Sequence, residues 1–171
     1  VIRLLQRLGV DVVLPPQKCS GTPIQTYGLY DRLKACARFN IDSLLRYETI
    51  VTGCASCTLM LKDYPAILDE GGERSKAADL ASRVFHITEF LTKKMDFHIP
   101  KGSTHPATER VVTYHSSCHL RAAGVTREPR ELLKQIPGIH FVEMQDADRC
   151  AGGAGTFIVK NYDLSSQIFQ R

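Results

Sequence analysis

The sequence has no long apolar run, and this absence excludes a membrane-spanning helix. No stretch of the 171 residues approaches the roughly 20 consecutive apolar side chains that such a helix needs. The first residues, Val1 to Leu5, lack an initiator Met and the layout of a secretory signal, and they are typical of a helix entered in mid-course. We therefore expect an excerpt from a longer protein, and no transmembrane segment within it.

The patterns of several common binding and catalytic classes are also missing. The 22 Lys and Arg residues are scattered, without a dense run or interleaved aromatics, so we expect no nucleic-acid binding. The sequence contains neither paired carboxylates nor a Ser, His and Asp order, so nothing in it indicates a hydrolase. The glycines of residues 152–155 lack the full spacing and the following Lys of a phosphate loop. We expect these small residues to let the backbone pass close to a bound group.

Cysteine is what the chain does contain. Its six cysteines are Cys19, Cys36, Cys54, Cys57, Cys118 and Cys150. Three disulfides are possible in principle, but nothing indicates secretion, and an intracellular Cys-x-x-Cys pair more often serves metal or redox chemistry. We therefore expect a cytoplasmic protein. Cys36 has no partner at ligand spacing, and we expect it to be a small buried residue.

The hydrophobic pattern alternates between helical and strand periods. The helices expected are 2–8, 29–47, 57–65, 77–91 with interruptions, 130–136 and 158–169, and the strands expected are 11–14, 49–52, 111–114 and 139–144. Alternation of this kind is typical of an α/β fold with largely parallel strands.

The two ends of the chain resemble each other. Residues 4–13 match residues 132–142 with one insertion, and each stretch is followed by Cys-x-Gly, at 19–21 and at 150–152. We predict two pseudo-repeated lobes, each a small, mainly parallel sheet flanked by helices. The first lobe covers residues 1–98 and the second lobe covers residues 108–171. Residues 99–107, which are poor in apolar side chains, form the linker between them.

The clearest candidate ligands are Cys54 and Cys57. Thiolates bind iron and zinc strongly, and two cysteines separated by two residues reach one centre when the backbone turns between them, as Gly53 allows. Cys54 is predicted to end a strand and start a helix, where free N–H groups can hydrogen-bond to sulfur. From the pair alone, a metal or cluster site, a thioredoxin-type redox dithiol and a chance pairing all remain open.

Four motifs in order carry a resemblance to a known family. They are Cys19-Ser20-Gly21, Gly53-Cys54-Ala55-Ser56-Cys57, Tyr114-His115-Ser116-Ser117-Cys118-His119-Leu120 and Cys150-Ala151-Gly152. The chain resembles the cysteine-rich CCG domain proteins, whose repeat carries a cysteine, then Cys-Cys-Gly, then Cys-x-x-Cys. This family includes heterodisulfide reductase subunits and the iron–sulfur subunits of glycolate oxidase, lactate oxidation complexes and anaerobic glycerol-3-phosphate dehydrogenase.

The resemblance implies two ligand sets and shows two departures. Its first site would use Cys19, Cys54 and Cys57, and its second Cys118 and Cys150; the remaining ligands would lie before the first residue and after the last. We therefore expect the chain by itself to hold no complete cluster. Ser20 and Ala151 replace the second cysteine of each Cys-Cys pair, which leaves four thiolates per repeat. That number suits a 4Fe-4S cluster or, as an alternative, a zinc ion.

Residues beside the thiolates are expected to support them. Gly21, Gly53 and Gly152 would bring the backbone close to sulfur, and His115 and His119 flank Cys118 as supporting residues. His119 could instead complete a zinc site in a truncated centre.

The resemblance implies an electron-transfer role. The chain would be the iron–sulfur subunit of a 2-hydroxyacid oxidase of glycolate or lactate type, non-catalytic alone. It would take electrons from a flavoprotein and pass them to a quinone or a ferredoxin-type acceptor. The expected location is the cytoplasm, including the inner face of the membrane. The alternatives are a heterodisulfide-reductase-like catalytic subunit, which the missing cysteines disfavour, and a zinc-stabilised structural domain.

Overall fold

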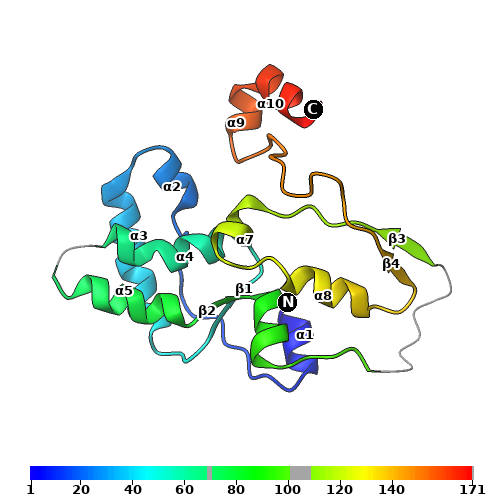
Figure 1. Cartoon of the computed structure of the whole chain (residues 1–171). Coiled ribbons are helices and arrows are strands. Elements are labelled where there is room, and N and C mark those ends of the chain that lie inside the picture. Colours follow the sequence, from blue (N-terminus) through cyan, green and yellow to red (C-terminus); the bar gives the residue numbers. More distant parts are fainter. Residues whose placement is uncertain (69–70, 101–108, 171) are drawn as a thin grey trace.

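The computed structural model describes residues 1–68, 71–100 and 109–170, and it alternates helices with short strands (Figure 1). The elements in chain order are α1 (Ile2–Arg7), α2 (Thr22–Thr26), α3 (Tyr30–Leu44), β1 (Ile50–Thr52), α4 (Ala55–Ile67), α5 (Glu73–Ser82), β2 (Val84–His86), α6 (Ile87–Glu89), a π-helical segment η1 (Phe90–Lys94), β3 (Arg110–Val112), α7 (Cys118–Ala122), α8 (Glu128–Gln135), β4 (Ile139–Phe141), α9 (Phe157–Lys160) and α10 (Tyr162–Gln170). No helix within the described ranges is long and apolar enough to cross a membrane.

The strands form two separate sheets of two parallel strands each. β1 pairs with β2, with Ile50 opposite Val84, and β3 pairs with β4, with Arg110 opposite Ile139. Parallel neighbours require a crossover connection, and helices supply it in both sheets: α4 and α5 in the first, α7 and α8 in the second. The predicted α/β fold with two small parallel sheets flanked by helices is confirmed.

The hydrophobic core lies in the first half of the chain, around the β1–β2 sheet. One stripe of α3 is buried at helical spacing, at Leu33, Ala37, Ile41 and Leu44. It packs with apolar side chains of β1, α4, α5 and β2 and of the residue after α4, which are Ile50, Met60, Leu61, Tyr64, Leu68, Ala77, Leu80 and Val84. This core holds the start of α4, and therefore the Cys-x-x-Cys pair, in place.

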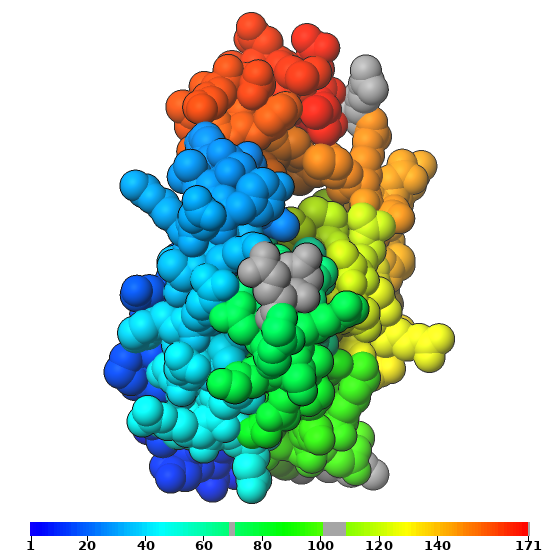
Figure 2. Space-filling model, turned by 90° about the vertical axis from the view of Figure 1, so that its left-hand side faces the viewer, coloured from blue at the N-terminus to red at the C-terminus, as the bar shows by residue number. Residues whose placement is uncertain are grey.

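The second half of the chain has few buried apolar side chains and packs against the first half. Its buried apolar side chains in the described residues are Leu120, Val125 and Pro129. α7 packs against α4, and α8 packs against α6. The C-terminal segment lies over the region of α2, where the space-filling view shows it resting on the first half (Figure 2).

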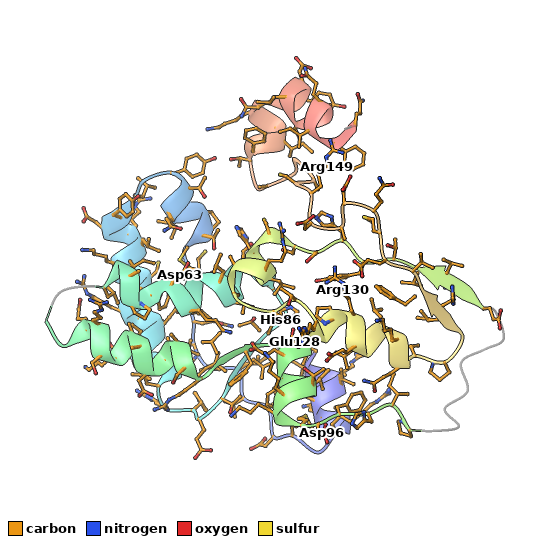
Figure 3. All side chains as sticks on the ribbon, viewed as in Figure 1. Asp63, His86, Asp96, Glu128, Arg130 and Arg149 are labelled. Carbon is orange, nitrogen blue, oxygen red and sulfur yellow. The ribbon has the colours of Figure 1, made fainter. Side chains whose placement is uncertain are left out.

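Ion pairs connect the two halves of the chain where α8 packs against α6. Glu89 and Glu128 are both buried, with exposed fractions of 8% and 5%. Lys93 lies 3.3 Å from Glu89 and 2.6 Å from Glu128, and Lys62 of α4 donates to Glu89 at 3.2 Å. Figure 3 shows Glu128 in the middle of the molecule, at the start of α8. Burial acts to raise the pKa of Glu128, but the hydrogen bonds from Lys93 and the Thr126 N–H outweigh it and lower that pKa.

One predicted strand is wrong, and the interruption expected within the helical residues 77–91 includes a strand. Residues 11–14 form no strand, because no other described segment pairs with them and Pro15 and Pro16 follow directly. The corresponding segment of the second repeat, β4, is a strand because it pairs with β3. Residues 77–91 are not one helix. α5 ends at Ser82, and β2 follows because Val84 and His86 bury their side chains beside β1.

Two further details differ from those expected. The terminal helix is broken at Asn161 into α9 and α10. Cys36 is partly exposed rather than buried, because it lies beside the apolar stripe of α3 instead of within it. Residues 101–108, which include most of the predicted linker, lie outside the described residues, so the lobe boundaries stay a prediction.

The turn into α2 depends on a glycine. Gly21 has φ +119°, which side chains rarely adopt, and a Cβ at this position would lie 2.1 Å from Leu33 Cδ1. Leu33 is fully buried on α3. The loop that carries Cys19 can therefore lie against α3 only because residue 21 has no side chain.

We expect Gly21→Ala to lower the free energy of unfolding by about 2–4 kcal/mol, from backbone strain together with overpacking against Leu33. Urea unfolding measures it. Gly28→Ala is the matched control, because Gly28 also has a positive φ, +70°, but no atom lies within 4 Å of the place its Cβ would take. Equal losses in the two variants would show that the contact with Leu33 contributes nothing.

We expect Glu128→Gln to lower the free energy of unfolding by about 1–2 kcal/mol at pH 7, because Lys93 loses a charged partner but is itself half exposed. A carboxyl whose folded-state pKa is lowered stabilises the fold above its unfolded pKa, about 4.3, and that stabilisation disappears as the pH falls through the lower folded value. The difference between the variant and the wild type should therefore shrink below about pH 4.

Urea unfolding at several pH values measures this difference. The control is Glu73→Gln, which removes the exposed carboxylate paired with Arg38 at 2.7 Å and should cost less at every pH. A difference for Glu128→Gln that stayed constant down to about pH 3 would contradict the assignment of the effect to a charged Glu128.

Candidate cysteine centre

Cys54 and Cys57 lie where β1 ends and α4 begins, as the sequence predicts. Cys54 is the N-cap of α4, with extended backbone angles, and Cys57 lies in the first turn. The Thr58 N–H and hydroxyl both donate to the Cys54 carbonyl, each at 2.9 Å, and so hold the turn. Gly53 is not in a left-handed conformation; its small size instead leaves room for Val1, whose Cγ2 would lie 3.1 Å from an added Cβ.

The two thiols of this pair differ in acidity. The pKa of Cys54 is lowered, chiefly because the Cys57 backbone N–H donates to its sulfur, with further help from the Cys57 thiol and the Ser56 N–H. Burial raises the pKa of Cys57; the Ser20 hydroxyl acts against this, and the neighbouring Cys54 and Cys19 add to it. Cys57 is the more buried of the two thiols, and Cys54 is exposed.

Cys19 is placed by a buried polar network that the sequence analysis missed. The Lys18 N–H donates to Asn40 Oδ1 at 2.8 Å, and Asn40 Nδ2 approaches the carbonyls of Lys18 and Cys19 at 3.3 and 3.4 Å. Asn40 also donates to the Tyr64 hydroxyl at 3.0 Å, which itself donates to the Ser20 carbonyl at 2.8 Å. α3 and α4 thus each contribute one buried side chain that holds the Cys19 loop.

A signal for this network existed in the sequence. Asn40 continues the apolar stripe of α3, one turn from Ala37 and beside Ile41, where a polar residue is unexpected. It is 1% exposed, and a side chain buried to that extent needs hydrogen-bond partners. Burial also raises the pKa of Tyr64 to about 12, so its hydroxyl remains a donor throughout the physiological range.

Two further contacts join the Cys19 loop to the start of α4. The Ser20 hydroxyl donates to Cys57 Sγ at 3.3 Å, and the Thr22 hydroxyl donates to the Ser56 carbonyl at 3.2 Å. The loop of the first Cys-x-Gly therefore lies directly against the Cys-x-x-Cys turn, although residues 20–53 separate Cys19 from Cys54 in sequence.

Hydrogen bonds between flanking residues also join the segments that carry the second pair of predicted ligands, Cys118 and Cys150. The Ser116 N–H donates to the Ala147 carbonyl at 2.7 Å, and Arg121 holds the Asp148 carboxylate at 2.9 Å and its carbonyl at 2.8 Å. Cys118 begins α7, two residues after Ser116, and Cys150 follows Asp148 by two. Both thiols are exposed.

Gly152 contacts the sulfur of Cys150 through its backbone. Its N–H donates to Cys150 Sγ at 3.4 Å, its φ is +70°, and its carbonyl accepts from the buried Ser165 of α10 at 2.7 Å. A Cβ on Gly152 would lie 2.7 Å from the Ser165 carbonyl oxygen, so α10 packs against bare backbone.

The two ligand sets face each other across the contact between α4 and α7. Ser56, between Cys54 and Cys57, shares a hydrogen bond of 2.6 Å with His119 Nδ1, next to Cys118. His119 therefore links the two motifs, whereas the side chain of His115 is exposed. A second link joins the Tyr27 hydroxyl after α2 to the Thr156 hydroxyl after the second Cys-x-Gly, and Lys160 lies over the Tyr27 ring at 4.9 Å.

The donor set is chemically suited to a group held by thiolates, such as an iron–sulfur cluster. All six cysteines are free thiols. Among residues 1–68, 71–100 and 109–170, no group of three or more His, Cys, Asp or Glu side chains surrounds the position of one metal ion, as a structural zinc site would require. N–H groups pointing at Cys54 and Cys150 are the contacts that sulfur ligands of iron receive.

Comparison with known proteins agrees with this arrangement. The family described as CCG, cysteine-rich domain, matches residues 1–62 and 112–171, one stretch in each half of the chain. Lactate utilization protein A of Bacillus licheniformis is 34% identical over 170 residues, which are 98% of this chain and 70% of that protein. The proteins of the same name from Oceanobacillus iheyensis and Bacillus subtilis are 35% and 33% identical, again over 98% of this chain and over 68% and 70% of their own lengths.

No solved structure matches the chain. The family match covers both cysteine motifs of each half, and the relatives align over nearly the whole chain. This protein belongs to the cysteine-rich CCG domain family.

Proposed function

We propose that the protein is an electron-transfer subunit whose thiolates hold an iron–sulfur cluster. The observation that supports the proposal is the contact of the Cys19 loop with the Cys-x-x-Cys turn, where the Ser20 hydroxyl donates to Cys57 Sγ at 3.3 Å and the Thr22 hydroxyl donates to the Ser56 carbonyl at 3.2 Å. Cys118 and Cys150 form the corresponding second set. The free thiols suit a reducing compartment, and we place the protein in the cytoplasm or on the inner face of the membrane.

The proposed cofactor is a 4Fe-4S cluster, which would supply one-electron chemistry when bound. Cys54 offers a thiol with a lowered pKa at a helix N-terminus, and Cys57 a more buried one that receives a hydrogen bond. The core behind α4 keeps one side of this centre away from water, and Gly21 brings backbone close to it, as Gly152 does for Cys150 of the second set. Zinc remains the alternative occupant.

The proposed substrate and partners follow from the relatives' name. Those proteins are named for lactate utilization. We propose that a flavoprotein oxidises lactate or a similar 2-hydroxyacid and passes electrons to this subunit. A quinone or a ferredoxin-type carrier would receive them. In this proposal the flavoprotein partner carries out the substrate chemistry, and this subunit carries the electrons.

A second candidate function is thiol–disulfide exchange by Cys54 and Cys57. One observation favours it: Cys54 and Cys57 are free thiols two residues apart at the N-terminus of α4, the arrangement of a redox-active dithiol. In this case Cys54→Ser would abolish exchange with a small disulfide and leave the metal content unchanged. Under the main proposal the same substitution removes a ligand and lowers the iron content.

We expect the natural full-length protein, purified without oxygen, to contain iron and acid-labile sulfide, and Cys57→Ser to lose most of both. Serine is a poorer ligand for iron than a thiolate. Iron and sulfide analysis together with visible absorption measures the loss. Cys36→Ser is the matched control, because Cys36 lies on α3 outside both sets and should leave the iron content unchanged.

Stoichiometric zinc without iron in the wild-type protein would contradict the iron–sulfur proposal. Equal iron losses in Cys57→Ser and Cys36→Ser would show that the loss reflects general instability rather than a missing ligand.

A further inference from the structure

Ser20 occupies the position at which the family's repeat carries its second adjacent cysteine. Its side chain is buried, with 8% exposed, and its hydroxyl donates to Cys57 Sγ at 3.3 Å. The position therefore still faces the first ligand set, but with a hydrogen-bond donor in place of a thiolate. Neither the family match nor the proposed ligand set assigns a role to this hydroxyl.

The hydroxyl is held in this orientation by its surroundings. The Ser20 carbonyl accepts from Tyr64, and the carbonyl of the preceding Cys19 lies within reach of Asn40. On the other side, Gly21 is fixed against Leu33. Since the backbone on both sides of Ser20 is tied to α3 and α4, the side chain that projects toward Cys57 has little freedom to move away.

A hydrogen-bond donor at this position changes the negative charge on the cysteine sulfur. A hydrogen bond to a ligating sulfur withdraws negative charge from it, and this stabilises the reduced, more negative state of the centre that the sulfur binds. A fifth thiolate at the same place would add negative charge and act in the opposite direction. The exchange of cysteine for serine thus changes the sign of the local contribution to the reduction potential.

We propose that Ser20 is a positioning residue that raises the reduction potential of the Cys19, Cys54 and Cys57 centre through its hydrogen bond to Cys57, without being a ligand itself. The proposal rests on the iron–sulfur function proposed above and deepens it. In the other half of the chain the equivalent residue is Ala151, which has no side-chain donor and is exposed. The hydrogen bond that Cys150 Sγ accepts there comes from the Gly152 backbone N–H.

This asymmetry makes the two centres unequal. Within the described residues, the first set has a side-chain donor in addition to its backbone donors, and the second has the backbone donor alone. The hydrogen bond from Ser20 therefore favours a higher potential at the first centre. The hydrogen bond of 2.6 Å between Ser56 and His119 links the start of α4 to α7.

The test is Ser20→Ala in the natural full-length, iron-loaded protein. We expect unchanged iron and sulfide content and a more negative midpoint potential of one cluster in an EPR-monitored redox titration. The expected shift is roughly a three- to tenfold change in the equilibrium constant for reduction, and tenfold corresponds to about 59 mV for one electron. A purely structural role would not move the potential while leaving the cluster content intact.

Ser43→Ala is the matched control. The Ser43 hydroxyl donates to the Pro16 carbonyl at 2.6 Å, so the substitution removes a hydroxyl that ties the same loop without touching a cysteine. Its midpoint potential should equal that of the wild type. An equal negative shift in both variants would overturn the proposal, because the shift would then reflect loosening of the loop.

Two other outcomes would also overturn it. Loss of iron in Ser20→Ala but not in Ser43→Ala would make Ser20 a ligand or an essential structural residue. An unchanged potential with full iron content would show that the hydrogen bond has no electrical effect. If the wild-type protein contained no iron, the function proposed above would fail as well, so the wild-type iron content separates the two failures.

Discussion

The hydroxyl of Tyr64, together with the amide of Asn40, decides where the first cysteine can lie. Both side chains are fully buried in a core that is otherwise mostly apolar, and each would be costly to bury without partners. Their partners are the carbonyls and the N–H of residues 18–20, which form no helix or strand. The loop is thereby fixed to α3 and α4, because moving it away would leave both buried groups without those bonds. Cys19 and the Ser20 hydroxyl follow from that constraint.

The two halves of the molecule are repeats in sequence but unequal in structure. The first has a core of its own around β1 and β2, whereas the second buries only Leu120, Val125 and Pro129 among its described apolar residues and relies on contacts with α4 and α6. The ion pairs of Glu89 and Glu128 with Lys93, and the hydrogen bond of Ser56 with His119, hold it there. The second ligand set is therefore positioned largely by the first half.

Much of the fold could be predicted from local patterns. The alternation of periods indicated an α/β chain, α3 appeared as an apolar stripe, and β1 and β4 as short β-branched or aromatic runs. The strand β2 was missed because three residues between helical stretches carry too weak a signal, and the strand at 11–14 was expected wrongly because its pattern alone does not show whether a partner is present. For the site, the cysteines and the glycines beside them were visible as motifs, but Asn40 and Tyr64 were not, since their role depends on a loop distant in sequence.

The sequence by itself determined the family, the order of the cysteine motifs and the presence of serine and alanine where that family has its second cysteine. These are properties of residue identity and spacing, which need no coordinates. Only the tertiary structure decided that Ser20 points at Cys57, that Cys19 lies against the start of α4 and that the two cysteine sets face each other through Ser56 and His119. The physical reason is that these contacts join residues far apart in the chain, and their geometry arises only when the core packs α3 against α4 and the buried polar groups find their partners.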